Sequence, residues 1–202
     1  GKGYGIKTTA LITDMNQPLG SAIGNWFEME ESVRGLQGEG PADLMDVTYA
    51  LGAEILKMSN PDLSQEAAID LQVKTVTEGS AFEKLKRITE LQGGDPGVLD
   101  NLSKYPRAKY SGAIQAPEAG YLAQIDTMAL GFAGIQLGAG RRKITDTIDY
   151  SSGMYIHSRI GDNLNRGDDI LTVYSNDEKA LREVLANGES IFTINPSPPE
   201  IP

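Results

Sequence analysis

The stretch TDMNQPLGSAIGNWFEMEE, residues 13–31, decides how the first part of the chain folds. It follows an apolar run ending at Ile12 and leads into a helical pattern, and its glutamates Glu28, Glu30 and Glu31 follow a loop rich in Asn, Pro, Gly and Ser. Acidic residues are favoured near a helix amino terminus by the helix macrodipole. Alternatively, a carboxylate and the free carbonyl oxygens of an irregular loop bind a hard cation. The stretch alone leaves both interpretations open.

A shared cation site would constrain the path of the backbone. In one straight helix beginning at Ala22, the Ala22 carbonyl and Glu31 would lie roughly 13 Å apart, at about 1.5 Å per residue. A common site therefore requires a bend between residues 19 and 25, which Gly20 and Gly24 permit. We accordingly predict that the helix starts after the bend and spans residues 26–36, with Asn25 as its N-cap.

This helix is predicted to have one apolar face and two local polar interactions. Glu28 is placed to return to the backbone as a capping-box carboxylate, and Glu30 and Arg34 are spaced for an i,i+4 ion pair. The apolar face consists of Trp26, Met29, Val33 and Leu36.

Composition argues against several classes of protein. Among 202 residues, 28 acidic and 18 basic side chains give a formal charge of −10, which argues against a general binder of nucleic acid or of anionic membranes. The lack of cysteine excludes disulfides, thiolate metal sites and cysteine nucleophiles. No apolar run approaches the roughly 18 residues of a membrane span, and we expect a cytoplasmic protein.

The single histidine, His157, lies in a strand-like run and is expected to be structural or on the surface.

The first half of the chain is predicted to be mostly helical. Residues 6–13, IKTTALIT, have the composition of a strand. Beyond the helix at 26–36, further helices are expected between Pro41 and Asn60, from about 65 to 76, and from a capping box at Ser80 to just before Gly93. The last of these is expected to bury Phe82, Leu85, Ile88 and Leu91.

The pattern changes near residue 105. Strand-like runs occupy 110–117, 120–126, 154–162 and 168–175, with helices near 127–137 and 177–186. We predict an α/β fold, in which residues 1–104 form the end of a mixed sheet with flanking helices. Residues 105–202 are predicted to form an α+β carboxy-terminal subdomain with barrel-sandwich character.

Two further motifs are candidate sites. The basic segment Gly138–Lys143 is either a phosphate-binding turn or a solvated one, and it lacks the GxxxxGK[ST] pattern of nucleotide loops. Residues 160–171, IGDNLNRGDDIL, resemble the turn and strand of biotinyl and lipoyl carrier domains. Those domains present a lysine on a hairpin, and no lysine lies between 144 and 178 here. A carrier role is therefore disfavoured, whereas a related shape is compatible.

Several blocks together resemble the thymidine and pyrimidine-nucleoside phosphorylases. They are ALITDMNQPLGSAIGN, LQGGDPGVLDNL, APEAGYLAQIDTMALG, LGAGRRKITDTIDYSSG and IGDNLNRGDDIL, in family order over nearly the whole chain. The resemblance implies a pentosyltransferase of nucleoside salvage, which uses phosphate to convert a pyrimidine nucleoside to free base and pentose 1-phosphate. Nothing in the chain distinguishes thymidine from uridine.

The resemblance covers only the downstream part of that family. The family's phosphate loop and its base-contacting Arg, Ser and Lys find no match here, so the resemblance implies no catalytic or cofactor-binding residue in this chain and no activity by itself. Because the chain starts at Gly1 instead of Met, we expect it to be a piece of a longer protein. The full-length enzyme is expected to be a homodimer and this chain a monomer. The resemblance also implies exposed apolar surface in place of lost sheet neighbours.

One family site does fall on this chain. The resemblance implies a potassium site with main-chain oxygens of Leu19 and Ala22 and the carboxylate of Glu31 as ligands, weak or absent without the phosphate loop. An alternative function is a non-enzymatic docking module that complements a separate amino-terminal half.

Overall fold

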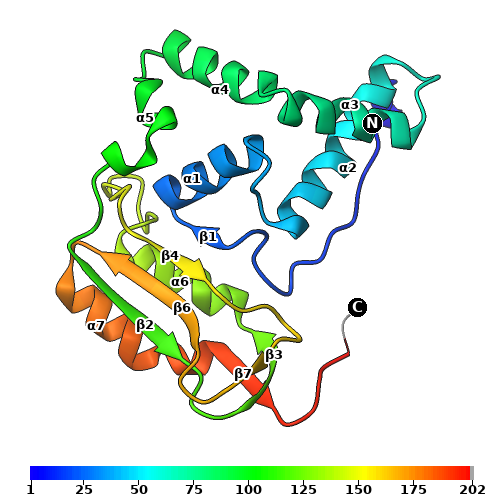
Figure 1. The fold of residues 1–202 in the computed structure, drawn as a ribbon. Coiled ribbons are helices and arrows are strands. Elements are labelled where there is room, and N and C mark those ends of the chain that lie inside the picture. The colour runs from blue at the N-terminus through cyan, green and yellow to red at the C-terminus, as the bar shows by residue number, and fades with distance from the viewer. Residues whose placement is uncertain (201–202) are drawn as a thin grey trace. The chain divides into compact units, whose positions relative to one another are not determined.

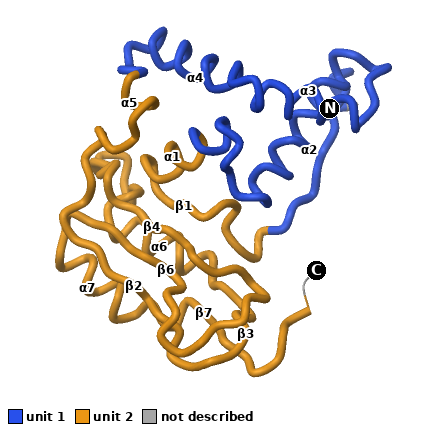
Figure 2. The backbone as a smooth tube through the Cα atoms, in the orientation of Figure 1, with its two compact units in different colours: residues 1–14, 33–96 blue, residues 15–32, 97–202 orange. Residues whose placement is uncertain are grey.

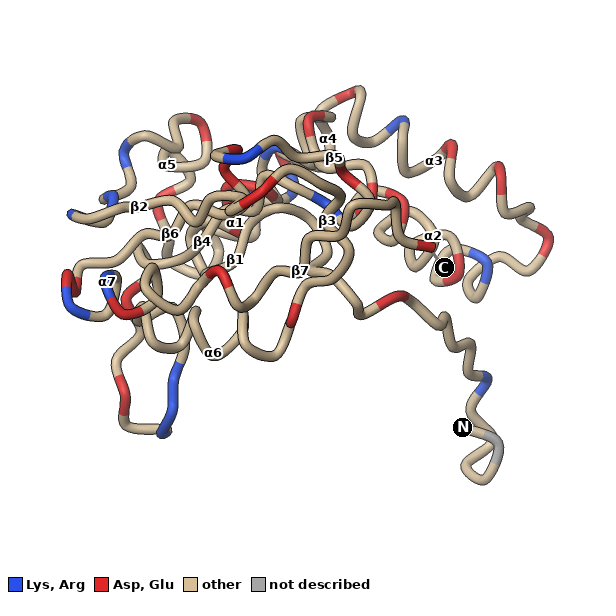
Figure 3. The backbone as a smooth tube through the Cα atoms, turned by 90° about the horizontal axis from the view of Figure 1, so that it is seen from below, with Lys and Arg blue, Asp and Glu red and all other residues tan. Residues whose placement is uncertain are grey.

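The computed structural model describes residues 1–200, so the last two residues of the predicted second subdomain lie outside it. The chain divides into two compact units, coloured separately in Figure 2. Unit 1 comprises residues 1–14 and 33–96, and unit 2 comprises residues 15–32 and those from 97 onward. The division differs from the predicted boundary at residue 104, because residues 15–32 join the carboxy-terminal unit through a strand pairing. Acidic and basic residues are spread over both units (Figure 3).

The α/β class is confirmed, and Figure 1 shows the order of the elements. Unit 1 holds a short 3-10 helix at Lys2–Tyr4, the end of α1 (Asn25–Leu36), α2 (Ala42–Ser59), α3 (Gln65–Thr77) and α4 (Ser80–Leu91). Unit 2 holds β1 (Ala22–Ile23), the start of α1, α5 (Gly97–Asp100), β2 (Tyr110–Gln115), β3 (Gly120–Ile125), α6 (Thr127–Leu137), β4 (Gly153–Ile156), β5 (Asn163–Leu164), β6 (Asp169–Ser175), α7 (Glu178–Asn187) and β7 (Phe192–Asn195), with 3-10 turns at Leu102–Lys104 and Gly188–Ile191. No helix within residues 1–200 combines the length and apolar character that crossing a membrane requires.

In unit 1, α2 and α3 pack through small residues. Ala53 and Ala68 are fully buried, and the Gln72 side chain donates to the carbonyl of Tyr49 at 3.0 Å. Gly52 makes this approach possible, because a Cβ there would lie 1.8 Å from Gln72 Oε1. The limits of α2 agree with the prediction between Pro41 and Asn60, and α3 agrees with the predicted range of about 65 to 76, ending one residue later.

Three predictions for unit 1 are wrong. Residues 6–13 form no strand, because a strand needs a hydrogen-bonding neighbour and none of residues 1–200 pairs with this segment. Ile12 is accordingly fully exposed. The capping box at Ser80 is not formed, since Gly79 precedes the helix and the Ser80 hydroxyl donates to the carbonyl of Thr75. No residue of α4 is buried, and Leu91 is 69% exposed.

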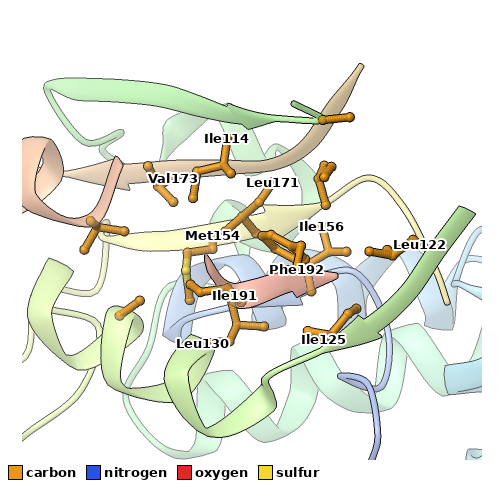
Figure 4. Packing of buried hydrophobic residues seen from close by; sticks show 14 of the residues in the cluster. Ile114, Leu122, Ile125, Leu130, Met154, Ile156, Leu171, Val173, Ile191 and Phe192 are labelled. Carbon is orange, nitrogen blue, oxygen red and sulfur yellow. The ribbon is translucent and has the colours of Figure 1, made fainter. Parts of the chain in front are cut away.

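Unit 2 is built on two antiparallel sheets. Their strand orders are β1-β4-β6-β2 and β5-β3-β7. The strands at 110–115, 120–125 and 169–175 confirm the strand-like runs predicted there. One face of β6 is buried through Leu171, Val173 and Ser175, as the two-residue period of a strand requires. The core combines both sheets with α6 and α7 (Figure 4). Its largest fully buried apolar members are Leu122, Leu130, Leu137, Met154, Ile156, Ile170, Leu171 and Val173.

A methyl group at Gly153 should destabilise unit 2, because it would lie 2.4 Å from the Ile23 carbonyl oxygen and 2.6 Å from the Phe27 ring. We expect Gly153→Ala to lower the free energy of unfolding by about 1–3 kcal/mol, the usual cost of overpacking. Urea denaturation followed by fluorescence of Trp26, the single tryptophan, measures it.

Gly131→Ala is the matched control, because a Cβ at this position of α6 has no neighbour within 4 Å. Here we expect unchanged or slightly higher stability, by up to about 1 kcal/mol from helix propensity. Equal destabilisation by both substitutions would contradict the packing described for β1 and β4.

Candidate cation-binding loop

The predicted bend is present in the structure. Gly20 and Gly24 have φ values of +69° and +117°, a region open mainly to glycine. Between them, β1 runs antiparallel to β4, and α1 begins at Asn25, one residue before the predicted start. The chain therefore enters α1 from an extended segment instead of continuing a helix from Ala22.

The bend lies against the carboxylate of Glu31. This side chain is only 8% exposed, and its Oε1 accepts hydrogen bonds from the backbone N–H groups of Ser21 at 2.7 Å and Ala22 at 3.2 Å. A Cβ on Gly20 would lie 2.2 Å from Oε2, so the carboxylate fills the space that glycine leaves. The structure thus brings Glu31 to Ala22, while Leu19, half-exposed, directly precedes the contacted glycine.

The register of β1 places the Ala22 carbonyl on the same side as Glu31. Ile156 donates its N–H to the Ser21 carbonyl at 2.8 Å, and Ala22 faces Tyr155. Hydrogen-bonded and non-hydrogen-bonded pairs alternate along antiparallel strands. Ala22 is therefore a non-hydrogen-bonded position. Its N–H and C=O both point away from β4, and on that side the N–H donates to the Glu31 carboxylate.

The main-chain carbonyl oxygens and the Glu31 carboxylate are ligand types that fit a monovalent cation. Carbonyl oxygens replace the hydration shell of potassium well, and one carboxylate supplies the opposite charge. Among residues 1–200, no group of three or more His, Asp or Glu side chains is placed to hold a metal ion. A site in this loop would therefore depend on main-chain oxygens together with Glu31.

The other two glutamates fix α1 from different sides. Glu28 Oε1 accepts the N–H of Gly24 at 2.9 Å, so its return to the backbone occurs one residue earlier than predicted. Glu30 forms a two-pronged ion pair with Arg107, at 2.6 and 2.7 Å. The predicted pair of Glu30 with Arg34 is wrong, because the buried Glu30 carboxylate faces the segment before β2. Its hydrogen bond raises the pKa of the Arg107 guanidinium.

Asn25 and Trp26 attach the start of α1 to neighbouring loops. The Asn25 side chain donates to the Ala139 carbonyl at 3.3 Å and does not cap its own helix, which corrects the predicted N-cap. Trp26 stacks on Tyr105 with ring centroids 3.9 Å apart, and its backbone N–H donates to the Tyr150 carbonyl at 3.3 Å. Burial raises the pKa of the Tyr105 hydroxyl.

Comparison with known proteins agrees with the resemblance. Residues 121–195 match the family described as pyrimidine nucleoside phosphorylase C-terminal domain. A pyrimidine-nucleoside phosphorylase of Geobacillus stearothermophilus is 40% identical over 179 residues, which are 89% of this chain and 41% of the relative. One of Staphylococcus aureus strain USA300 is 36% identical over 194 residues, 96% of this chain and 45% of the relative. The chain contains the carboxy-terminal domain of the pyrimidine-nucleoside phosphorylase family, and most of its length is similar to members of that family. It spans less than half the length of these relatives.

Two other candidate features of the chain have structural roles. His157 Nε2 lies 2.7 Å from the hydroxyl of Thr172 on the neighbouring strand. In the basic segment 138–143, the N–H groups of Arg142 and Lys143 donate to Asp146 at 3.0 and 2.9 Å. Their use within the turn favours the solvated-turn interpretation over a phosphate cradle.

Asp149 stabilises the loop that receives the Trp26 N–H. It accepts from the N–H and hydroxyl of Ser151, the hydroxyl of Ser152 and the amide of Asn176, at 2.7–3.0 Å. Burial raises the pKa of the Asp149 carboxyl, but these hydrogen bonds outweigh it and hold the pKa below its ordinary value of 3.8.

Because the folded pKa of Asp149 is lowered, its contribution to stability should be present above pH 3.8 and lost as the pH falls through the folded value. We expect Asp149→Asn to be less stable than the wild type near neutral pH, and this difference to shrink on acidification. Urea midpoints measured between about pH 7 and pH 3 by Trp26 fluorescence give the comparison. A difference that stays constant across this range would contradict the role of the charged carboxylate.

Proposed function

We propose that this chain is the downstream part of a pyrimidine-nucleoside phosphorylase, which transfers a pentosyl group from a pyrimidine base to inorganic phosphate. The match to proteins of that name, over 89% of this chain at 40% identity, carries the proposal. The bond between base and sugar breaks, and a phosphate oxygen takes its place on the sugar carbon. The cytoplasmic location and the homodimeric state of the whole enzyme stay predictions.

In this proposal the chain contributes positioning and no catalytic residue. Its described residues fix the bend at 19–24 through Glu31, Glu28 and the pairing of β1 with β4. Main-chain oxygens of Leu19 and Ala22 and the Glu31 carboxylate would hold potassium. When bound, that ion supplies positive charge beside the phosphate. Electrostatic stabilisation of this kind requires groups held in place before reaction.

The purified 202-residue chain should release no pyrimidine base from uridine or thymidine in the presence of phosphate. The resemblance assigns the phosphate-binding and base-binding groups to a region outside this chain, and phosphorolysis needs a positioned phosphate. Chromatographic detection of free base over hours at high chain concentration tests this expectation. Robust base release by the chain alone would contradict the assignment of those groups elsewhere.

A second candidate function is a non-enzymatic docking module that binds a separately supplied amino-terminal half. Exposed apolar side chains favour it, since Ile6 is 63% and Ile12 101% exposed in the segment that resembles a strand. Adding the unmatched portion of the Geobacillus relative in trans separates the two functions. Restored base release supports a segment of the enzyme, whereas binding without base release supports the docking module.

Glu31→Gln should weaken cation binding, because it removes the charge of the proposed site while keeping an oxygen that can accept from Ser21 and Ala22. In the full-length enzyme that contains this chain, we expect at least about tenfold lower affinity for thallium(I), a potassium substitute, measured by thallium NMR. Glu118→Gln, at an exposed position, is the control and should bind as the wild type does. Equal affinity of the Glu31 variant and the wild type would remove Glu31 from the site.

A further inference from the structure

The candidate cation loop is also held from the segment that follows β4. The N–H of Ile160 donates to Gln17 Oε1 at 3.1 Å. The guanidinium of Arg159 donates from Nη1 to the Pro18 carbonyl at 2.9 Å and from Nη2 to the Ser21 hydroxyl at 3.2 Å. The two Arg159 contacts join residues that are separated by 141 and 138 positions in the sequence and that meet in unit 2.

The two Arg159 contacts lie on either side of Leu19, one of the three proposed ligand residues. Pro18 and Ser21 flank Leu19 and Gly20, which lie in no helix or strand. A guanidinium is a planar fork with fixed spacing between its donors. By binding one acceptor on each side, it restricts the distance between the Pro18 carbonyl and the Ser21 hydroxyl, across Leu19 and Gly20.

Arg159 is itself anchored in the fold. Its N–H donates to the Asp162 carboxylate at 2.7 Å, and its carbonyl accepts from the Asp162 N–H at 3.0 Å. The neighbouring positions bind β3, since Leu122 accepts from Gly161 and donates to Asp162, at 2.8 and 2.9 Å. Leu122 is fully buried in the core. A continuous series of contacts therefore leads from the core of unit 2 to the loop.

We propose that Arg159 is the positioning residue of the cation loop, holding the Leu19 carbonyl in line with Ala22 and Glu31. The proposal rests on the proposed function, because it concerns the same potassium site. A simple electrostatic role would have the opposite sign. The positive charge of Arg159 repels a cation, so an arginine acting only through charge would weaken cation binding, and its removal would strengthen it.

Thallium NMR titrations test this role in the full-length enzyme that contains this chain, as wild type and as the variants Arg159→Met, Arg159→Lys and Arg166→Met. Methionine keeps the aliphatic length without donors, and lysine keeps the charge without the fork. Arg166 is exposed in the next turn and, within residues 1–200, forms no ion pair, so its substitution is the control. We expect the Met variant at 159 to lose at least about tenfold in thallium affinity, the Lys variant to recover part of it, and the control to match the wild type.

Hydrogen exchange of the Ser21 and Ala22 amides, which donate to Glu31, supplies a readout that needs no ion. We expect at least about tenfold faster exchange of these amides in Arg159→Met than in wild type, with β4 and β6 unchanged. Unchanged exchange in the loop, or tighter thallium binding by Arg159→Met, would overturn the positioning role.

The outcomes for the two proposals are distinguishable. If the full-length wild-type enzyme shows no saturable thallium response, the cation site itself is contradicted, and this inference with it. If the wild type and Glu31→Gln differ as expected but Arg159→Met equals wild type, only the role of Arg159 is overturned.

Discussion

The buried carboxylate of Glu31 is the constraint on which the path of residues 15–32, the first segment of unit 2, depends. A charge removed from water costs several kcal/mol unless hydrogen bonds compensate it. Here the compensation includes the amides of Ser21 and Ala22. A helix continued from Ala22 would place Glu31 far from both, so the bend and the buried charge require each other. Gly20 is the third part of this arrangement, because any larger residue would occupy the position of the carboxylate.

The question raised by three clustered glutamates has a different answer for each. Glu28 returns to the backbone before α1, Glu30 pairs with Arg107, and Glu31 binds the bend. Only the first is the role that a helix amino terminus would give to any acidic residue. Glu30 connects α1 to Arg107, which is distant in sequence, and Glu31 connects α1 to the bend that precedes it. Both contacts hold the start of α1 against the loop.

The sequence predicted features governed by local or periodic signals. Glycine positions permitted the predicted bend, Pro41 predicted the start of α2, and strand-like runs separated by turns predicted the strands of unit 2. The predictions of the Glu30 ion pair and of the strand at 6–13 failed because a distant partner decides the outcome. Glu30 is 77 positions from Arg107, and nothing nearby distinguishes that partner from Arg34. Likewise, a strand-like composition at 6–13 cannot form a strand without a neighbour, and Arg159 carries no local signal of its contacts with Pro18 and Ser21.

A crystal structure of the full-length enzyme that contains this chain, grown in a rubidium salt, tests the central claim most directly. Our account predicts a break before Asn25, the Glu31 carboxylate within hydrogen-bond distance of the Ser21 amide, and an anomalous peak bounded by Glu31 and the carbonyls of Leu19 and Ala22. An unbroken helix from Ala22 through Leu36, with the Glu31 side chain directed into solvent, would contradict it.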